Sequence, residues 1–485
     1  MENSKQDQIA LIVDSALHTI EKNNPSLKGA LPDNYFSRLN MDPSKLAALL
    51  DTINNIDTVG DEEEDVVGRI YEYFLGRFAA AEGKGGGEFY TPKSIVNLIA
   101  EMLEPYKGKI YDPCCGSGGM FVQSIKFVQS HQGNTKDISI YGQEFTAVTY
   151  KLAKMNLAIR GIAANLGEVP ANTFFRDQHP DLKADFILAN PPFNQSQWRE
   201  KSELEDDPRW AGFTTPPTGN ANYAWMLHML SKLSENGTAG FVMANGSMSS
   251  NTSGEGDIRR ELVEKDLVDC MIALPGQLFY TTQIPVCLWF ITKNKKQRPH
   301  PENPEIQFRD RSGETLFIDA RQLGTMIDRT QKELTKEDIE LIASTYHNWR
   351  NVTPSIPLKG EDVIASDEGA KQSPDVRLSG VEAPLELSDS RLKGARGDKD
   401  TISSKDQGGY SDIPGFCKSA TLSEIAANDY VLTPGRYVGI AEEEEDVELF
   451  EEKMSELTAT LKAQLDQAKV LDQAILENLK GLGYE

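Results

Sequence analysis

The sequence has few of the features that mark secreted, membrane-spanning or disulfide-stabilised proteins. It holds five cysteines in 485 residues, which is too few for a disulfide framework in a chain of this length. No apolar run approaches the roughly 20 residues that a membrane-spanning helix needs. The first eight residues are polar and unlike a secretory signal. We therefore expect a reduced, cytoplasmic protein that makes no membrane contact.

Positive charge is also scarce. The chain has 50 Lys and Arg against 74 Asp and Glu, a net charge of −24. Contacts to nucleic-acid phosphates need Lys and Arg, so the overall field argues against a stand-alone nucleic-acid binder. The net charge does not exclude a local basic groove, or a partner that supplies the affinity for nucleic acid.

The order of apolar patterns divides the chain into four segments. Apolar residues recur at helical spacing in residues 10–20 and 66–78, which predicts an N-terminal helical domain. A Ser-, Asp-, Gly- and Lys-rich stretch near the C-terminus predicts a linker or insertion. The predicted segments are a helical domain at 1–85, a catalytic domain at 86–365, a flexible linker at 366–412 and a tail at 413–485.

Strands and helices alternate through the second segment. This alternation predicts an α/β fold with a parallel sheet that helices cover on both faces. The expected strands are 109–111, 138–141, 184–189 and 239–243, and the expected helices begin near 120 and cover 148–159. Two further apolar runs, 268–274 and 285–292, are joined by a Pro-Gly-Gln link, and so short a link predicts an antiparallel pair.

The tail contains a heptad pattern that is typical of a long helix. Apolar residues recur every seven positions, at Val447, Met454, Leu461, Ala468, Ile475 and Leu482. Such a helix packs either against a helix of a partner or against its own domain.

A glycine-rich loop follows the first expected strand. It reads Asp112-Pro113-Cys114-Cys115-Gly116-Ser117-Gly118-Gly119. Ligands bind at the carboxyl ends of strands in open parallel sheets, and glycines let the backbone approach them. Glu144 follows the next strand, where an acid can accept hydrogen bonds from ribose hydroxyls. Together these features favour a nucleoside cofactor, although the spacing differs from the dinucleotide-binding fingerprint.

The adjacent cysteines in this loop have three possible roles. A zinc site is disfavoured because Cys114 and Cys115 lack Cys-x-x-Cys spacing and nearby His ligands, and we predict no metal. A nucleophile is conceivable because Cys114 follows a proline. We favour the third role, in which the cysteines are small, soft packing residues under the loop.

A second motif, Asn190-Pro191-Pro192-Phe193, ends the strand at 184–189. With the glycine loop and Glu144 upstream, it resembles the catalytic motif of S-adenosylmethionine-dependent DNA methyltransferases that act on the N6 amine of adenine. The chain is most similar to the modification subunits of type I restriction–modification systems. Further segments that resemble those subunits are 177–185, 220–225, 273–279 and 433–438.

The resemblance implies a methyltransferase with a Rossmann-like sheet and S-adenosylmethionine as cofactor. It implies two cofactor-binding segments, of which the second is the glycine loop with Asp112, Gly116, Ser117, Gly118 and Gly119. The first segment consists of Glu88, Phe89, Tyr90, Thr91, Pro92 and Lys93. Glu144 and Asn172 complete the implied cofactor site. The family often has Asp in place of Asn172, and Asn can still accept one hydrogen bond from the adenine amine.

The motif suits methyl transfer to an exocyclic amine. This displacement needs no nucleophile from the enzyme. The Asn190 side-chain oxygen and the Pro191 carbonyl can accept hydrogen bonds from the two N–H groups of the amine. These bonds position the amine and favour a nucleophilic nitrogen. Pro191 and Pro192 fix the backbone, and Phe193 offers a stacking face for a base that leaves the duplex.

The resemblance also implies partners. Modification subunits rely on a separate specificity subunit to recognise a DNA sequence, and two of them join one such subunit. A restriction subunit can complete the complex. Alternatives are a solitary adenine methyltransferase, an enzyme that methylates protein glutamine or RNA, and a non-catalytic scaffold subunit. A nicotinamide-dependent oxidoreductase is a more distant alternative, since its fingerprint is missing.

Overall fold

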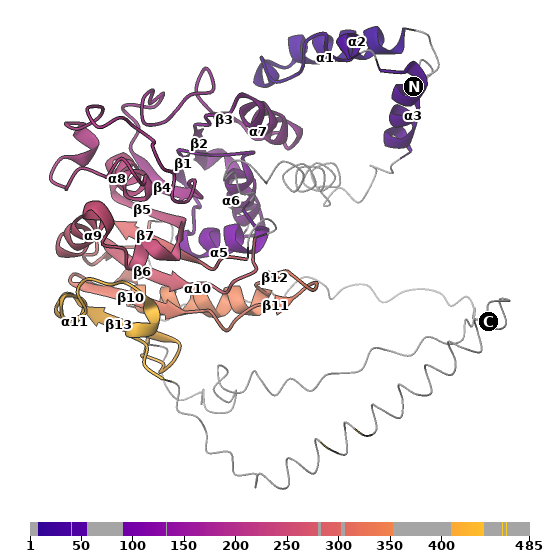
Figure 1. Ribbon diagram of the computed structural model, residues 1–485. Coiled ribbons are helices and arrows are strands. Elements are labelled where there is room, and N and C mark those ends of the chain that lie inside the picture. Colours follow the sequence, from indigo (N-terminus) through magenta and orange to yellow (C-terminus); the bar gives the residue numbers. More distant parts are fainter. Residues whose placement is uncertain are drawn as a thin grey trace. The chain divides into compact units, whose positions relative to one another are not determined.

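One large sheet organises most of the described residues (Figure 1). The computed structural model describes residues 8–39, 41–55, 91–131, 133–279, 283–301, 306–352 and 409–440, with Thr458 and Lys462. Nine strands of these residues pair in the order β13-β10-β6-β7-β5-β4-β1-β2-β3. Their bounds are β1 Gly108–Asp112, β2 Ile138–Gly142, β3 Ala164–Asn165, β4 Ala184–Ala189, β5 Leu233–Ala244, β6 Val268–Ala273, β7 Val286–Thr292, β10 Glu314–Asp319 and β13 Cys417–Thr421.

Most neighbouring strands in this sheet are parallel. Strands β1 to β5 pair in parallel with one another, as do β6 and β10. Strand β7 is antiparallel to both β5 and β6, which confirms the antiparallel pair predicted from the two apolar runs. Two short hairpins lie outside the sheet, β8 Arg298–Pro299 with β9 Gln307–Phe308 and β11 Thr325–Met326 with β12 Lys332–Glu333.

Helices cover both faces of the sheet, as predicted. One face packs against α5 Lys93–Leu103, α6 Gly119–Ser130, α7 Ala147–Ile159 and α10 Lys336–Arg350. The other packs against α8 Asn222–Lys232, α9 Glu255–Glu264 and α11 Leu422–Ala427. Successive side chains of a strand point to opposite faces, so Leu288 and Phe290 of β7 join the first core and Cys287 and Trp289 join the second.

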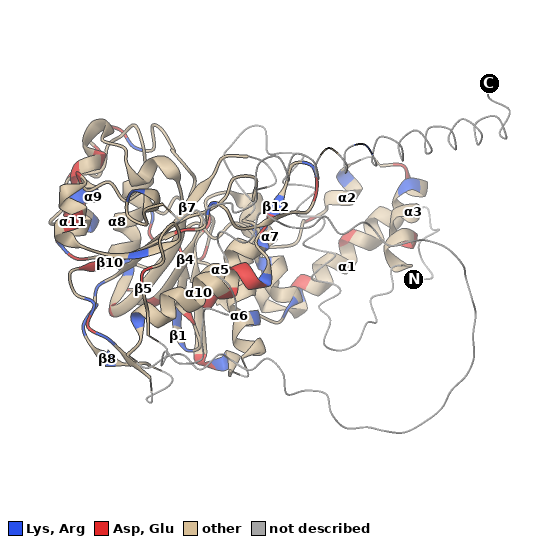
Figure 2. Ribbon diagram, turned by 90° about the horizontal axis from the view of Figure 1, so that it is seen from below, with Lys and Arg blue, Asp and Glu red and all other residues tan. Residues whose placement is uncertain are grey.

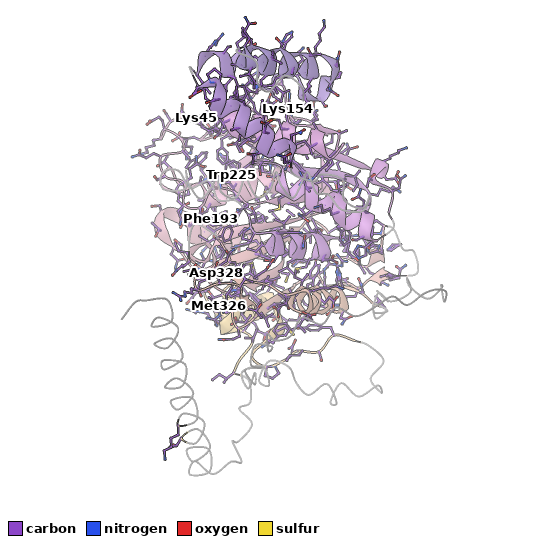
Figure 3. All side chains as sticks on the ribbon, turned by 90° about the vertical axis from the view of Figure 1, so that its right-hand side faces the viewer. Lys45, Lys154, Phe193, Trp225, Met326 and Asp328 are labelled. Carbon is purple, nitrogen blue, oxygen red and sulfur yellow. The ribbon has the colours of Figure 1, made fainter. Side chains whose placement is uncertain are left out.

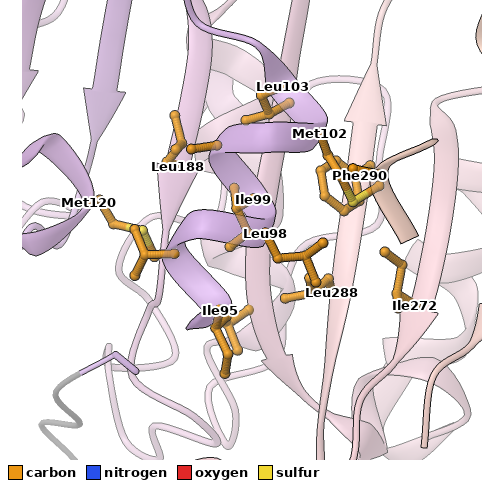
Figure 4. Packing of buried hydrophobic residues seen from close by; sticks show 14 of the residues in the cluster. Ile95, Leu98, Ile99, Met102, Leu103, Met120, Leu188, Ile272, Leu288 and Phe290 are labelled. Carbon is orange, nitrogen blue, oxygen red and sulfur yellow. The ribbon is translucent and has the colours of Figure 1, made fainter. Parts of the chain in front are cut away.

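Helix α5 lies centrally on the first face, between α6 and α10. Its side chains Leu98, Ile99 and Met102 are completely buried, and they meet Leu188 of β4 and Leu288 of β7 (Figure 4). Each such burial contributes about 1.5–3 kcal/mol. This packing fixes the position of α5, whose N-terminal end carries the described part of the first predicted cofactor segment.

The N-terminal residues that the structure describes are helical. They form α1 Ile9–Asn23, α2 Tyr35–Arg38 and α3 Pro43–Asn54, with a 3₁₀ turn at Pro25–Leu27. The carboxylate of Asp14 in α1 accepts hydrogen bonds from the backbone N–H groups of Phe36 (3.1 Å) and Ser37 (2.9 Å). The helix predicted at 10–20 is confirmed. The helical pattern at 66–78 lies outside the described residues, and the boundary at 85 stays a prediction.

The C-terminal part of the sheet differs from expectation. Strand β13 pairs with β10, so the sheet includes residues that the sequence analysis assigned to the tail at 413–485. The sequence of β13, Cys-Lys-Ser-Ala-Thr, has no apolar run that would indicate a strand. Strand β10 and helix α10 were also not predicted individually. Of the heptad helix, the structure describes Thr458 and Lys462, both helical, and the six heptad positions themselves lie outside the described residues.

Candidate active site

Three neighbouring parallel strands bring the predicted site residues to one edge of the sheet. Strands β4, β1 and β2 are adjacent. Asp112 is the last residue of β1, Asn190 follows β4 directly, and Glu144 follows β2 by two residues. Because the strands are parallel, their carboxyl ends meet at the same edge, where open α/β sheets bind ligands. The strand ends that the sequence marked thus lie at one edge of the sheet.

The glycine loop between β1 and α6 leaves space beside its backbone. Gly116 and Gly118 have φ angles of 53° and 81°, a left-handed conformation that favours glycine. A Cβ atom built on Gly116 or Gly119 would meet no atom of the described residues within 4 Å. Asn156 Nδ2 donates to the Ser117 carbonyl over 2.7 Å and steadies the loop from α7. A ligand can therefore approach the loop backbone closely at Gly116 and Gly119.

Glu144 joins this loop to the start of α7. One carboxylate oxygen accepts a hydrogen bond from the Gly116 N–H (3.0 Å), and the other accepts one from the Thr146 N–H (2.8 Å). Glu144 therefore fixes the glycine loop relative to the start of α7. The next residue, Phe145, is 69% exposed. Sequence reasoning missed this aromatic ring, whose position directly after the strand-end acid was the available signal.

Gln143 holds the segment that contains Asn172 against β2. Its Nε2 donates to the carbonyls of Ala171 (3.1 Å) and Arg176 (2.8 Å), and its Oε1 accepts from the Gln178 N–H (3.0 Å). Asn172 itself caps the enclosed turn, since its Oδ1 accepts from the Phe174 N–H over 2.9 Å. Its predicted contact with an adenine amine would need the second lone pair of that oxygen, and it stays a prediction.

Asp112 and the two cysteines are electrostatically unusual. Burial raises the pKa of the Asp112 carboxyl to about 7, and the charge of Glu144 adds to the rise, whereas the hydrogen bond from the Cys114 N–H (3.0 Å) opposes it. Burial also raises the pKa of the Cys114 and Cys115 thiols well above their usual value. Both are free thiols and stay neutral, so neither is an activated nucleophile. The described residues contain no cluster of three or more His, Cys, Asp or Glu suited to a metal ion.

The side-chain amide of Asn190 has one hydrogen bond. Its Nδ2 donates to Thr91 Oγ1 over 2.9 Å. Its Oδ1 is buried and has no partner among the described residues. An unsatisfied buried acceptor costs about 1–3 kcal/mol, so a donor placed beside this oxygen would be stabilising.

Phe193 (labelled in Figure 3) packs beside a second aromatic ring. The ring centroids of Phe193 and Phe279 are 6.1 Å apart at an interplanar angle of 78°. Phe279 lies in the 273–279 segment, and the neighbouring Gln277 accepts a hydrogen bond from the Lys332 N–H of β12 over 2.9 Å. Pro191 is buried and Pro192 is half-buried. The catalytic motif is therefore packed between the sheet and this segment.

The first predicted cofactor segment is only partly described. Thr91 meets Asn190 as stated above, Pro92 precedes α5 as its N-cap, and Lys93 is the first residue of that helix. Glu88, Phe89 and Tyr90 lie outside the described residues.

No described helix is long and apolar enough to span a membrane.

Comparisons with known proteins agree with this geometry. The family model described as N-6 DNA Methylase matches residues 62–379 and 396–446. The HindI type I restriction enzyme methylase subunit of Haemophilus influenzae is 46% identical over 484 residues, 98% of this chain and 93% of that protein. The MjaIX methylase subunit of Methanocaldococcus jannaschii is 36% identical over 491 residues, 100% of this chain and 75% of that protein.

A solved structure extends the likeness to the fold. The type I restriction–modification methyltransferase subunit of Streptococcus thermophilus has a TM-score of 0.64 and 25% identity, covering 88% of this chain and 76% of that chain. The chain belongs to the N-6 DNA methylase family, among the methylase subunits of type I restriction enzymes.

Proposed function

We propose that this chain transfers a methyl group from S-adenosylmethionine to the N6 amine of an adenine in double-stranded DNA, within a type I restriction–modification complex. The observation that carries the proposal is the Oδ1 of Asn190 at the end of β4, which is buried and has no hydrogen-bond partner in the described part of the chain. An exocyclic amine supplies the N–H donor that this oxygen lacks. The Thr91 contact turns the Asn190 amide so that its oxygen, and not its nitrogen, faces the incoming group.

The residues of the neighbouring strand ends fit the cofactor. S-adenosylmethionine, when bound, supplies an electrophilic methyl group on a sulfonium. The open backbone at Gly116 and Gly119 gives room for it. Glu144 lies at the carboxyl end of β2, where an acid can accept hydrogen bonds from ribose hydroxyls, and the exposed ring of Phe145 can cover the purine. The carboxyl of Asp112 can face the positive charge.

The chain then needs only to position the amine. The Asn190 oxygen and the Pro191 carbonyl accept hydrogen bonds from its two N–H groups. These bonds direct the nitrogen lone pair away from both oxygens. This arrangement uses positioning and electrostatics. Since the amine cannot be reached inside the duplex, the adenine flips out of the stack, and Phe193 stacks on it. The transferred methyl replaces one N–H proton, which leaves to solvent.

Charge supports the need for a partner. Lys and Arg are scattered over many elements and interspersed with Asp and Glu (Figure 2), and the net charge is −24. We propose that a specificity subunit supplies most of the DNA affinity and all of the sequence recognition, and that two copies of this chain join it. The predicted heptad helix is the segment we propose for docking to that subunit.

The test is methylation in cells. This chain is expressed with and without its candidate specificity subunit in cells that lack adenine methylation, and the genomic DNA is sequenced for N6-methyladenine. We expect methylation at one sequence, only with the partner, and none with Asn190→Ala. Methylation by this chain alone would indicate a solitary enzyme. No methylation in either case would overturn the proposal in favour of a protein or RNA substrate, or of a silent scaffold.

A further inference from the structure

The residue after the catalytic motif has a left-handed backbone. Asn194 has a φ angle of 52°, in the region that L-residues other than Asn, Asp and Gly seldom adopt. The chain turns sharply here, immediately beyond Phe193. The path of the chain beyond Phe193 therefore depends on the backbone conformation of Asn194.

Asn222 holds Asn194 in that conformation. The Asn194 N–H donates to Asn222 Oδ1 over 2.9 Å, and Asn222 Nδ2 donates to Asn194 Oδ1, also over 2.9 Å. The two residues thus form a reciprocal pair in which Asn222 uses both ends of its amide. One of its bonds holds the backbone, and the other holds the side chain of Asn194.

Asn222 is itself rigidly anchored. It is 2% exposed and is the first residue of α8, where Tyr223, Ala224 and Met226 are completely buried. The Asn222 N–H donates to Asn220 Oδ1 over 3.0 Å. One residue earlier, the Ala221 N–H donates to the carbonyl of Gln195 over 3.0 Å. The start of α8 is therefore joined to the catalytic loop at two consecutive residues of that loop.

We propose that Asn222 is a positioning residue for methyl transfer. By fixing Asn194 in the left-handed conformation, it holds Phe193 and the Pro191 carbonyl in the orientation that receives the flipped adenine. Both ends of its amide bond to Asn194, so we assign it a role that acts through the loop and without contact to the reacting amine. The inference rests on the proposed function, since it assigns a role within that reaction.

The test uses the complex of this chain with its specificity subunit. In Asn222→Ala we expect the single-turnover methylation rate constant to fall about ten- to a hundredfold, the scale of a small misplacement of reacting groups. The fluorescence rise of 2-aminopurine at the target position, which reports base flipping, should fall as well. The Kd for S-adenosylmethionine should stay within about twofold, because the glycine loop and Glu144 are untouched.

A matched control separates this role from general packing. Asn294 also donates its amide to another asparagine, Asn236, over 2.7 Å, and caps the Lys296 N–H over 3.0 Å. It lies just after β7, at the opposite edge of the sheet. Asn294→Ala loses the same kinds of bond and should leave both the rate constant and the fluorescence signal unchanged.

Position 194 gives a second test that does not depend on the folding of Asn222→Ala. Glycine adopts a φ of 52° without strain, whereas alanine does not. Asn194→Gly should therefore methylate several times faster than Asn194→Ala. Equal rates for these two variants, or an unchanged rate and fluorescence signal in Asn222→Ala, would overturn the inference. A wild-type complex that does not methylate adenine, or an active Asn190→Ala, would instead overturn the proposed function.

Discussion

Thr91 and Asn190 are 99 residues apart in the sequence and form one hydrogen bond of 2.9 Å, in which the Asn190 amide donates to the Thr91 hydroxyl. The Asn190 oxygen, at the other end of the amide, has no partner among the residues that the structure describes. Thr91, two residues before α5, thus holds the nitrogen end of the Asn190 amide. The first predicted cofactor segment, of which Thr91 is part, therefore also acts on the catalytic motif.

Removing the Thr91 hydroxyl should impair catalysis. In Thr91→Val the Asn190 amide loses its acceptor and can rotate, which exposes a donor to the substrate amine in place of an acceptor. We expect kcat to fall about tenfold, the equivalent of about 1.4 kcal/mol. Steady-state kinetics of the complex would measure it. Thr91→Ser keeps the hydroxyl and should retain most of the activity. Equal kcat values for the Val and Ser variants would contradict the prediction.

Filling the space beside the glycine loop should weaken cofactor binding. Gly116→Ala places a methyl group in the open space where the cofactor is proposed to lie. We expect the Kd for S-adenosylmethionine, measured by calorimetry, to rise by about tenfold or more, since binding would lose at least about 1.4 kcal/mol.

Gly313→Ala is the control for backbone strain. Gly313 also has a positive φ, 78°, and its Cβ would likewise meet no described atom within 4 Å, but it precedes β10 at the other edge of the sheet. It should cost similar stability without changing the Kd. A Kd that is equally unaffected in both variants would place the cofactor elsewhere.

The sequence predicted those parts of the fold and site that depend on local pattern. Apolar runs located β1, β2, β4, β6 and β7. The polar residues at the ends of β1, β2 and β4 predicted which edge of the sheet holds the candidate site. Contacts between distant residues were not predictable in this way. Neither Thr91 with Asn190 nor Asn194 with Asn222 leaves a local signal, since each pair meets only after strands and helices have packed.

Strand β13 shows a second limit. Its sequence has neither an apolar run nor a strict alternation of apolar and polar residues, and pairing with β10 determines its conformation. Tertiary context overrides local preference at such edge strands. The same reasoning explains why β13 was not predicted within the 413–485 segment.

Removing one partner of the buried ion pair between Asp269 and Arg311 should destabilise the fold strongly. Asp269 is in β6, Arg311 precedes β10, and both side chains are at most 1% exposed. Asp269 accepts from Arg311 Nε over 2.8 Å and from the Tyr346 hydroxyl over 2.7 Å. Asp269→Ala leaves Arg311 buried without its partner, so the free energy of unfolding should fall by about 3–5 kcal/mol.

Denaturant titration would measure this loss, with Asp257→Ala as the control. Asp257 pairs with Arg260 over 3.0 Å, but the two side chains are 52% and 47% exposed. Its removal should cost at most about 1 kcal/mol. Similar losses of unfolding free energy in the two variants would show that breaking the buried pair costs no more than breaking the exposed one.

Asp112 should couple cofactor binding to proton release. Burial raises the pKa of its carboxyl to about 7, above the value of about 3.9 in an unfolded chain. The folded state therefore binds the extra proton between about pH 4 and pH 7, and the contribution of Asp112 to stability falls as the pH rises through that window. A cation placed beside the carboxyl favours the ionised form and lowers its pKa. Binding of positively charged S-adenosylmethionine should thus release a proton near pH 7.

Calorimetric titrations at pH 7, in two buffers that differ in ionisation enthalpy, would detect the released proton as a difference in apparent binding enthalpy. The affinity for S-adenosylmethionine should also rise between pH 6 and pH 8, since ionising Asp112 before binding removes the cost of expelling its proton. In Asp112→Asn both effects should disappear, because the amide does not titrate. Buffer-independent enthalpy in the wild-type protein would mean that Asp112 does not face the positive charge of the cofactor.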